Sequence, residues 1–206
     1  MAFPTGYLRE VNDPSTSALI MWDFQVGLAG RALDLDRLLA ANRRLLDAAD
    51  AAGVPVIWSR HTLVPPTLET PGLQCFMLGK QGADSVADIK PFMLVGSPER
   101  EFLPGLHPRD HDLVIAKHTP SFFVGTALEQ RLRGLGRTTL VFTGVATEIG
   151  VDLSAKHSLA LGYVPMVVED AVGSYTAERK EAGIAALRTW IPVVTTDEII
   201  GFWEAA

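Results

Sequence analysis

The strongest constraint on the fold is a regular alternation of short apolar runs and amphipathic segments in the second half of the chain. Apolar runs at 112–116, 138–144, 163–168 and 191–195 alternate with helix-like segments at 126–135, 148–161 and 177–187. Strands that alternate with helices form a parallel sheet with helices on both faces, joined by right-handed crossovers. The sequence therefore predicts a three-layer α/β/α fold with a mainly parallel, Rossmann-like sheet.

The first half of the chain begins the same pattern and then interrupts it. Residues 17–23 form a continuous apolar run that ends in a carboxylate, as expected for a strand buried on both faces. The apolar spacing predicts a helix over 33–52, and 54–59 predicts a second strand. The segment 61–108 is rich in Pro and Gly. It predicts loops and a short helix, and we expect this segment to cover the functional site, because long irregular segments in compact domains are often functional.

Composition narrows the class of protein. A chain of 206 residues with 48% hydrophobic and 20% charged residues predicts one domain spanning 1–206. A net charge of −6 with 18 Lys and Arg argues against a nucleic-acid partner, and no apolar run approaches the roughly 20 residues that span a membrane. The N-terminus lacks a signal-peptide pattern, and the lone Cys75 cannot form an internal disulfide. We therefore expect a cytoplasmic protein that binds neither nucleic acid nor membrane.

Candidate site residues lie where the predicted strands end. Active sites of parallel sheets occupy the crevice beyond the carboxyl ends of the strands, where Asp23, Lys117 and the 144–150 turn fall. The turn joins a buried strand to a helix, so its free backbone N–H groups can hold an anion or an oxyanion. Each feature also has a structural interpretation: a turn carboxylate, a solvated lysine and an ordinary strand-to-helix connection.

Three segments, in order and in register with this fold, resemble the isochorismatase-like, or cysteine hydrolase, superfamily. They are 18–25, 117–128 and 143–151, followed by Gly162-Tyr163 and 168–171, and the resemblance extends over about residues 17–203. It implies that Asp23 takes the acidic catalytic position and Lys117 the basic one. It also implies a cis peptide between Val145 and Ala146.

Gly150 departs from the pattern of the family's amidases, which carry a nucleophilic cysteine at this position. Glycine offers no nucleophile, and Thr147, Ser154 and Ser121 have no obvious activating base in the sequence. A glycine-bearing subgroup of the family cleaves a vinyl ether, which needs only an acid and water. Alternatively, Asp23 and Lys117 activate water for attack on a carbonyl, with the N–H groups of Ala146 and Gly150 holding the oxyanion.

Further residues around the turn and the strand ends are candidate substrate contacts. Ala146 and Thr147 lie in the turn itself, and Arg60 follows the second strand, where it could meet an anionic substrate or form a surface ion pair. The aromatic residues Phe24, Phe122, Phe123 and Tyr175 could wall an apolar pocket, although aromatics after strands are often core. His61 has no second histidine before His107, so we expect no metal site and no cofactor.

Together these features predict a hydrolase that acts on a small polar or carboxylated molecule without covalent catalysis. Asp23 would be the acid or base and Lys117 its electrostatic partner, and the bond would be a vinyl ether or a C–N bond. The alternative is a catalytically silent module that binds a small molecule or another subunit on the same fold. The resemblance implies a homo-oligomer, and Phe202-Trp203 would suit a contact within or between subunits.

Overall fold

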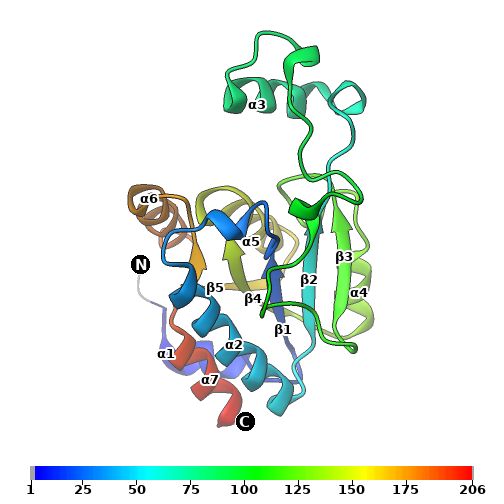
Figure 1. Ribbon diagram of the computed structural model, residues 1–206. Coiled ribbons are helices and arrows are strands. Elements are labelled where there is room, and N and C mark those ends of the chain that lie inside the picture. The colour runs from blue at the N-terminus through cyan, green and yellow to red at the C-terminus, as the bar shows by residue number, and fades with distance from the viewer. Residues whose placement is uncertain (1–2, 206) are drawn as a thin grey trace.

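Six parallel strands form one sheet in the order β3-β2-β1-β4-β5-β6, so the direction of winding reverses between β1 and β4 (Figure 1). The structure is a computed structural model that describes residues 3–205. The strands are β1 (Ser17–Trp22), β2 (Val56–His61), β3 (Leu113–Lys117), β4 (Thr139–Val145), β5 (Val164–Gly173) and β6 (Val193–Val194). The sheet confirms the predicted α/β class, and all of its pairings are parallel.

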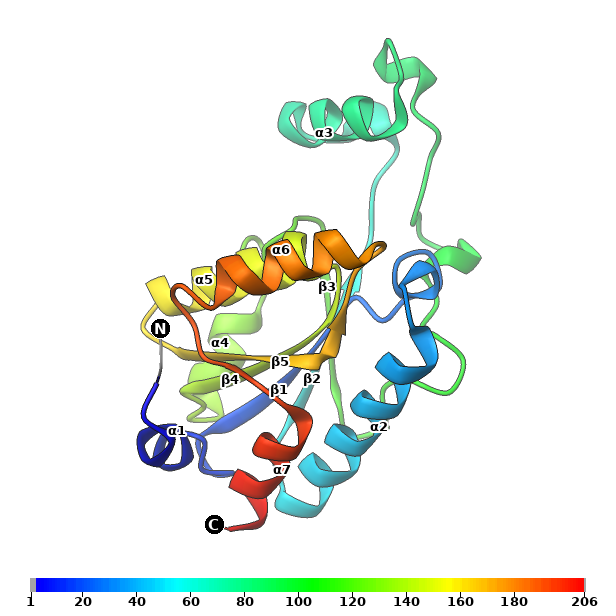
Figure 2. The same cartoon turned by 90° about the vertical axis from the view of Figure 1, so that its left-hand side faces the viewer.

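Helices cover both faces of the sheet (Figure 2). One face carries α1 (Thr5–Val11), α2 (Leu35–Ala52) and α7 (Thr196–Glu204). The other carries α4 (Leu128–Gly134), α5 (Asp152–Ala160) and α6 (Ala177–Leu187). In the part of the chain that the structure describes, no helix has the length and apolar character needed to cross a membrane.

The central strand β1 is buried along its whole length, which explains why its sequence shows no polar alternation. Leu19 and Met21 pack in the core beneath α2 and α7. Ile20 and Trp22 pack in the core beneath α4, α5 and α6. Side chains of a strand alternate between the faces of the sheet, so the face reached by Trp22 is fixed by the register of β1.

Residues 62–101 form an arm that stands above the carboxyl ends of the strands and carries α3 (Pro71–Gln81) (Figures 1 and 2). The arm has a small apolar core of its own, made of Leu63, Met77, Ile89 and Met93. Buried Gln25 connects the two chain segments at the base of the arm, because its amide donates to the carbonyls of His61 and Arg100 at 3.0 and 2.7 Å. The arm is therefore anchored at its base and packs mainly on itself above it.

Several element boundaries differ from the sequence prediction. The strand predicted to end at Val168 continues to Gly173, because the charged pair that follows Val168 finds partners within the strand: Glu169 contacts Arg188, and Asp170 accepts the N–H of Thr196 at 2.8 Å. Helices α1 and α7 were not predicted. The last two aromatic residues, Phe202 and Trp203, lie on α7 and are buried within the subunit.

Candidate active site

Asp23 and Lys117 meet at the carboxyl edge of the sheet. The Lys117 Nζ lies 2.8 Å from the Asp23 Oδ2, and the residues are only 1% and 5% exposed. Asp23 follows β1 with a φ of +51°, in the left-handed region. Ser59 of β2 holds it there, because the Ser59 hydroxyl donates to Oδ1 at 2.5 Å and accepts the Asp23 N–H at 2.9 Å. The sheet thus presents a fixed carboxylate against a fixed ammonium.

Lys117, the last residue of β3, is surrounded by three further groups. Its Nζ lies 4.0 Å from the ring centroid of Trp22, within the range of a cation–π interaction. It also lies 3.2 Å from the Nδ1 of His61 and donates to the Thr119 carbonyl at 3.4 Å. The ammonium is therefore held by Asp23 on one side and by an aromatic face on another.

Burial brings the proton affinities of the pair closer together. It raises the pKa of Asp23 above its usual value, while the charge and hydrogen bond of Lys117 oppose this shift. It lowers the pKa of Lys117, which Asp23 in turn opposes. Moving a proton between such groups costs less than it would in water, as expected of an acid–base pair at a site.

His61 is the third titratable group at this edge. Burial, followed by the charge of Lys117, holds the pKa of His61 well below its usual value. The ring is therefore neutral near pH 7. Because the Lys117 ammonium can only donate, Nδ1 is the acceptor and the ring proton sits on Nε2.

The turn after β4 contains the cis Val145–Ala146 peptide that the resemblance implied. Its side chains serve the fold: the Thr147 hydroxyl donates to the Gly173 carbonyl at 2.8 Å, and Ala146 belongs to the core beneath α2. The turn continues as a single π-helical stretch over Thr147–Val151 before α5 begins.

Gly150 lies directly against the indole of Trp22. A Cβ built at this position would overlap three atoms of the indole, Cζ2, Cε2 and Nε1. Trp22 is itself fully packed, with its ring edge-on to Phe122 at 5.6 Å between centroids. The space that a side chain at 150 would need is therefore filled by Trp22.

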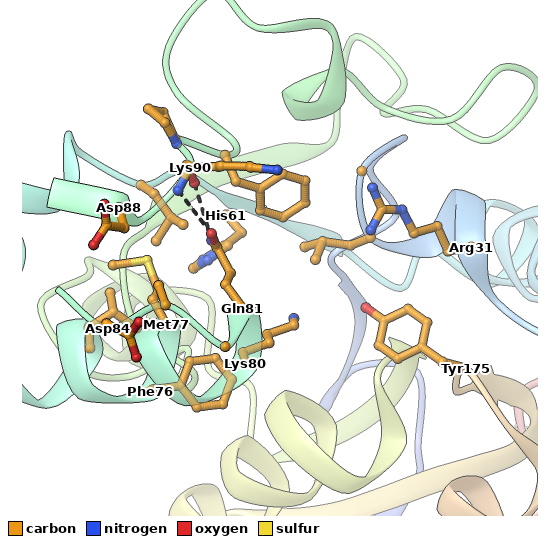
Figure 3. Close-up of a pocket in the computed structure, with 18 of the residues that line it drawn as sticks. Arg31, His61, Phe76, Met77, Lys80, Gln81, Asp84, Asp88, Lys90 and Tyr175 are labelled. Carbon is orange, nitrogen blue, oxygen red and sulfur yellow. Dashed lines mark hydrogen bonds between the residues drawn. The ribbon is translucent and has the colours of Figure 1, made fainter. Parts of the chain in front are cut away.

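A cavity of about 930 Å³ lies between the arm and the body of the protein (Figure 3). His61 and Tyr175 line it on the side of the sheet, and α3 lines it on the side of the arm. Behind His61 lies the Lys117 ammonium, 3.2 Å from the His61 Nδ1 and 2.8 Å from the Asp23 Oδ2. After burial, the charge of Asp23 is the next largest cause that raises the pKa of Tyr175. Asp23 and Lys117 are buried and do not themselves line the cavity; His61, which does, connects the cavity to the pair through its contact with Lys117.

The structure brings some of the predicted site residues together and separates others. Asp23, Lys117 and Gly150 all meet around Trp22. Phe24 and Phe122 are fully buried, whereas Tyr175 does line the cavity. The aromatic residues that follow strands are thus mostly core, as the alternative interpretation held.

Two more expectations need correction. Arg60 points to the opposite face of the sheet, where its guanidinium lies 4.5 Å from the ring centroid of Phe102. Phe123 packs against His157 and Tyr163, away from the cavity. Ser121 does have a basic partner, His157 Nδ1 at 2.8 Å, which the sequence did not reveal; Ser121 is 4% exposed and does not line the cavity.

Sequence reasoning missed Trp22, Ser59 and His61 as members of the site. The register contained the signal for two of them: Ile57 packs beneath α4–α6, and alternation places Ser59 and His61 on that same face. Across residues 3–205, no three His, Cys, Asp or Glu side chains lie together in a way that could hold a metal ion.

The isochorismatase domain family matches residues 17–198 of the chain. The chain belongs to the isochorismatase family. Ureidoacrylate amidohydrolase RutB of Methylobacterium radiotolerans is similar to it. The two are 30% identical over an alignment 205 residues long, which covers 90% of this chain and 80% of the relative. Family and relative together identify the chain as an isochorismatase-family hydrolase.

Solved structures of the isochorismatase family have the same fold. A cysteine hydrolase from Pseudomonas syringae pv. phaseolicola 1448A matches with a TM-score of 0.78 and 21% identity over 93% of this chain and 94% of that one. An isochorismatase family protein from Burkholderia thailandensis matches with a TM-score of 0.74 and 27% identity over 92% and 96% of the two chains. The likeness extends over nearly the full length in both cases.

Proposed function

We propose that this hydrolase cleaves a C–N bond of a ureido or amide compound by direct attack of water, without a covalent intermediate. Asp23 acts as the general base and then as the acid, and Lys117 supplies positive charge. The observation that carries the proposal is the 2.8 Å contact of this buried pair beside a position 150 that Trp22 closes to any side chain. The 30% identity to an amidohydrolase supports the choice of a C–N bond.

The reaction needs two proton transfers, and one carboxylate can perform both. Water attacks the carbonyl carbon while Asp23 takes its proton, and the Lys117 ammonium stabilises the oxyanion that forms. The C–N bond then breaks as the acid form of Asp23 returns the proton to the leaving nitrogen. Positioned acid–base groups contribute about 10²- to 10⁴-fold, and the close proton affinities of the pair suit this exchange.

Neither Gly150 nor Cys75 supplies a nucleophile in this scheme. Cys75 is exposed on α3 and does not line the cavity. The N–H groups of Ala146 and Gly150 are proposed to assist in holding the oxyanion, as expected for a turn that leads into a helix.

A second candidate is acid-catalysed cleavage of a vinyl ether. The raised pKa of Asp23 favours it, because a carboxyl group that holds its proton more tightly is more often in the acid form. Protonation of the enol carbon would give an oxocarbenium ion that water captures. This route also needs no side chain at position 150.

The test is a substrate panel with the purified protein. Ammonia release is followed with ureidoacrylate, N-carbamoyl amino acids and simple amides, and isochorismate loss is followed in parallel, before and after treatment with iodoacetamide. The proposal predicts ammonia release that survives alkylation of Cys75. Turnover of isochorismate alone would favour the vinyl ether route, loss of activity on alkylation would show a covalent role of the thiol, and no turnover at all would favour a silent binding module.

A further inference from the structure

One end of the cavity gathers three cationic side chains from three separate elements. Arg31 comes from the turn Ala29–Arg31 after β1, Lys80 from α3 of the arm and Arg179 from α6. Figure 3 shows the Arg31 guanidinium, the Lys80 ammonium and the Tyr175 hydroxyl directed toward the same open space. The protein as a whole carries a net charge of −6, so this concentration of positive charge is not a property of its composition.

Within the described part of the chain, two of these cations, Arg31 and Lys80, are not paired with a carboxylate, and the third, Arg179, is paired with Glu148 at 2.7 Å. Burial, and then the charges of Arg179 and Arg31, lower the pKa of Lys80, and the charge of Glu148 opposes this shift. Three cations that face one another with one carboxylate, Glu148, beside them leave an excess of positive charge that an anion would stabilise.

The walls beside the cations are apolar. Lys80 lies 5.7 Å from the ring centroid of Phe76, and Arg31 lies 5.8 Å from that of Phe92. Leu63, Leu73 and Met77 complete the apolar side of the cavity. Asp84 and Asp88 lie on the side away from Arg31 and Tyr175 (Figure 3), so the carboxylates of the cavity wall are apart from Arg31. Lys90 also lines the cavity.

We propose that Arg31, Lys80 and Arg179 bind the carboxylate of a substrate whose apolar body lies against α3. The inference rests on the proposed function, because the scissile group of such a ligand would then face His61, behind which the Asp23–Lys117 pair lies. A volume of about 930 Å³ is large for an acid of a few atoms and fits a carboxylate that carries an aromatic or branched aliphatic group. The arm therefore selects substrates by charge and by apolar bulk.

Equilibrium binding tests the inference without requiring turnover. Isothermal titration calorimetry compares 2-naphthoate with its neutral counterpart 2-naphthamide, on the wild type and on Asp23→Asn. We expect the Kd of 2-naphthoate to be lower than that of 2-naphthamide by about tenfold or more in both proteins. This difference in Kd should become smaller as salt is added. Inorganic phosphate is the third probe, because an anion without an apolar body should compete only weakly.

Variants identify the groups responsible. Arg31→Gln, Lys80→Gln and Arg179→Gln should each weaken 2-naphthoate about three- to fivefold, and the triple variant roughly thirtyfold, with little change for 2-naphthamide. Arg131→Gln is the matched control, because Arg131 is an exposed cation on α4 outside the cavity. Equal binding of the two naphthalene compounds, tighter binding of phosphate, or equal effects of Arg131→Gln and Lys80→Gln would overturn the inference. Carboxylate-selective binding with no hydrolysis of any substrate would instead retain the site and overturn the proposed reaction.

Discussion

At position 150, Trp22 of the neighbouring strand β1 leaves room only for glycine. The indole of Trp22 fills the space of a side chain at 150, and its face carries the Lys117 ammonium. Trp22 and Gly150 therefore form an interlocked pair, and the pair supports the charge at the centre of the proposed reaction. Adding a nucleophile to this chain would require a change at both positions.

Gly150→Ala tests the interlock. We expect it to lower the free energy of unfolding by about 1 to 3 kcal/mol, because the new methyl group must displace a packed indole. Gly201→Ala in α7 is the control, because a methyl group there meets no atom within 4 Å; it should be neutral or stabilising by up to about 1 kcal/mol. Urea denaturation measures both, and Gly150→Ala should cost less in a Trp22→Val background than in the wild type, because the smaller side chain leaves room for the new methyl group. Equal effects of the two glycine substitutions would contradict the interlock.

His61 gives the protein a pH-dependent stability whose sign can be worked out. Its folded-state pKa lies well below 6.5, whereas in the unfolded chain it titrates near 6.5. As the pH falls below about 6.5, the unfolded chain binds a proton that the folded protein does not, so the free energy of unfolding decreases. Relative to His61→Gln, the wild type should lose up to about 1.4 kcal/mol per pH unit between about pH 6.5 and pH 5. Urea unfolding curves across this range measure the difference, and stability profiles that stay parallel would refute the prediction.

At the scale of the elements, the strands themselves could be predicted from the sequence, but the face of the sheet on which each side chain lies could not. The apolar runs and the helical spacing were enough to predict the parallel sheet, and the strand ends placed Asp23 and Lys117 at the same edge of it. Their pairing as acid and base was implied by the family resemblance, and the two side chains do meet. The face that each side chain takes near the end of β2 follows from alternation only once the face of Ile57 is known, and the apolar run 54–58 alone does not give that face. Arg60 was therefore expected in the site, whereas its neighbour His61 occupies it.

Helix α7 was missed although its start signal was present. Thr195 and Glu198 form a capping box, in which the Thr195 side chain accepts the N–H of Glu198 and the Glu198 side chain accepts that of Thr195. The helix is short, and packing of Phe202 and Trp203 against the core stabilises it more than its own propensity does. Such tertiary stabilisation cannot be read from a local window of sequence.

The arm is predicted to open locally before the sheet does. Its apolar core is small, and Leu68 and Phe76 remain exposed on it at 73% and 48%. Hydrogen exchange read by mass spectrometry should show amides of 71–81 exchanging well before those of 139–145. Binding of a carboxylate ligand should slow exchange in 71–81, because Lys80 would then be held. Protection of α3 equal to that of β4 in the free protein would show that the arm is covered by something other than its own core.

At the scale of the whole molecule, the winding reversal explains why one edge of the sheet holds the site. Strands β1 and β4 are paired, but the chain leaves β1 toward α2 on one face and leaves β4 toward α5 on the other. Ligands of open α/β sheets bind at such points, beyond the carboxyl ends of the strands. Asp23 follows β1, and Lys117 ends β3 two strands away, so the long Lys117 side chain spans β2 to reach it. The arm then adds the cavity in which a substrate can be held above this pair.

The role of Asp23 is tested by kcat/KM of Asp23→Asn on whichever substrate the panel identifies. Removing the carboxylate leaves Lys117 buried without its counter-ion, so circular dichroism must first show a folded protein. Ser59→Ala keeps the Asp23 carboxylate but removes the hydrogen bond that Ser59 donates to it, so it is the companion variant in case Asp23→Asn does not fold. If Asp23 is the acid and base, kcat/KM should fall by about 10²- to 10⁴-fold in Asp23→Asn and by less in Ser59→Ala. A folded Asp23→Asn protein that hydrolyses the substrate at close to the wild-type rate would contradict it.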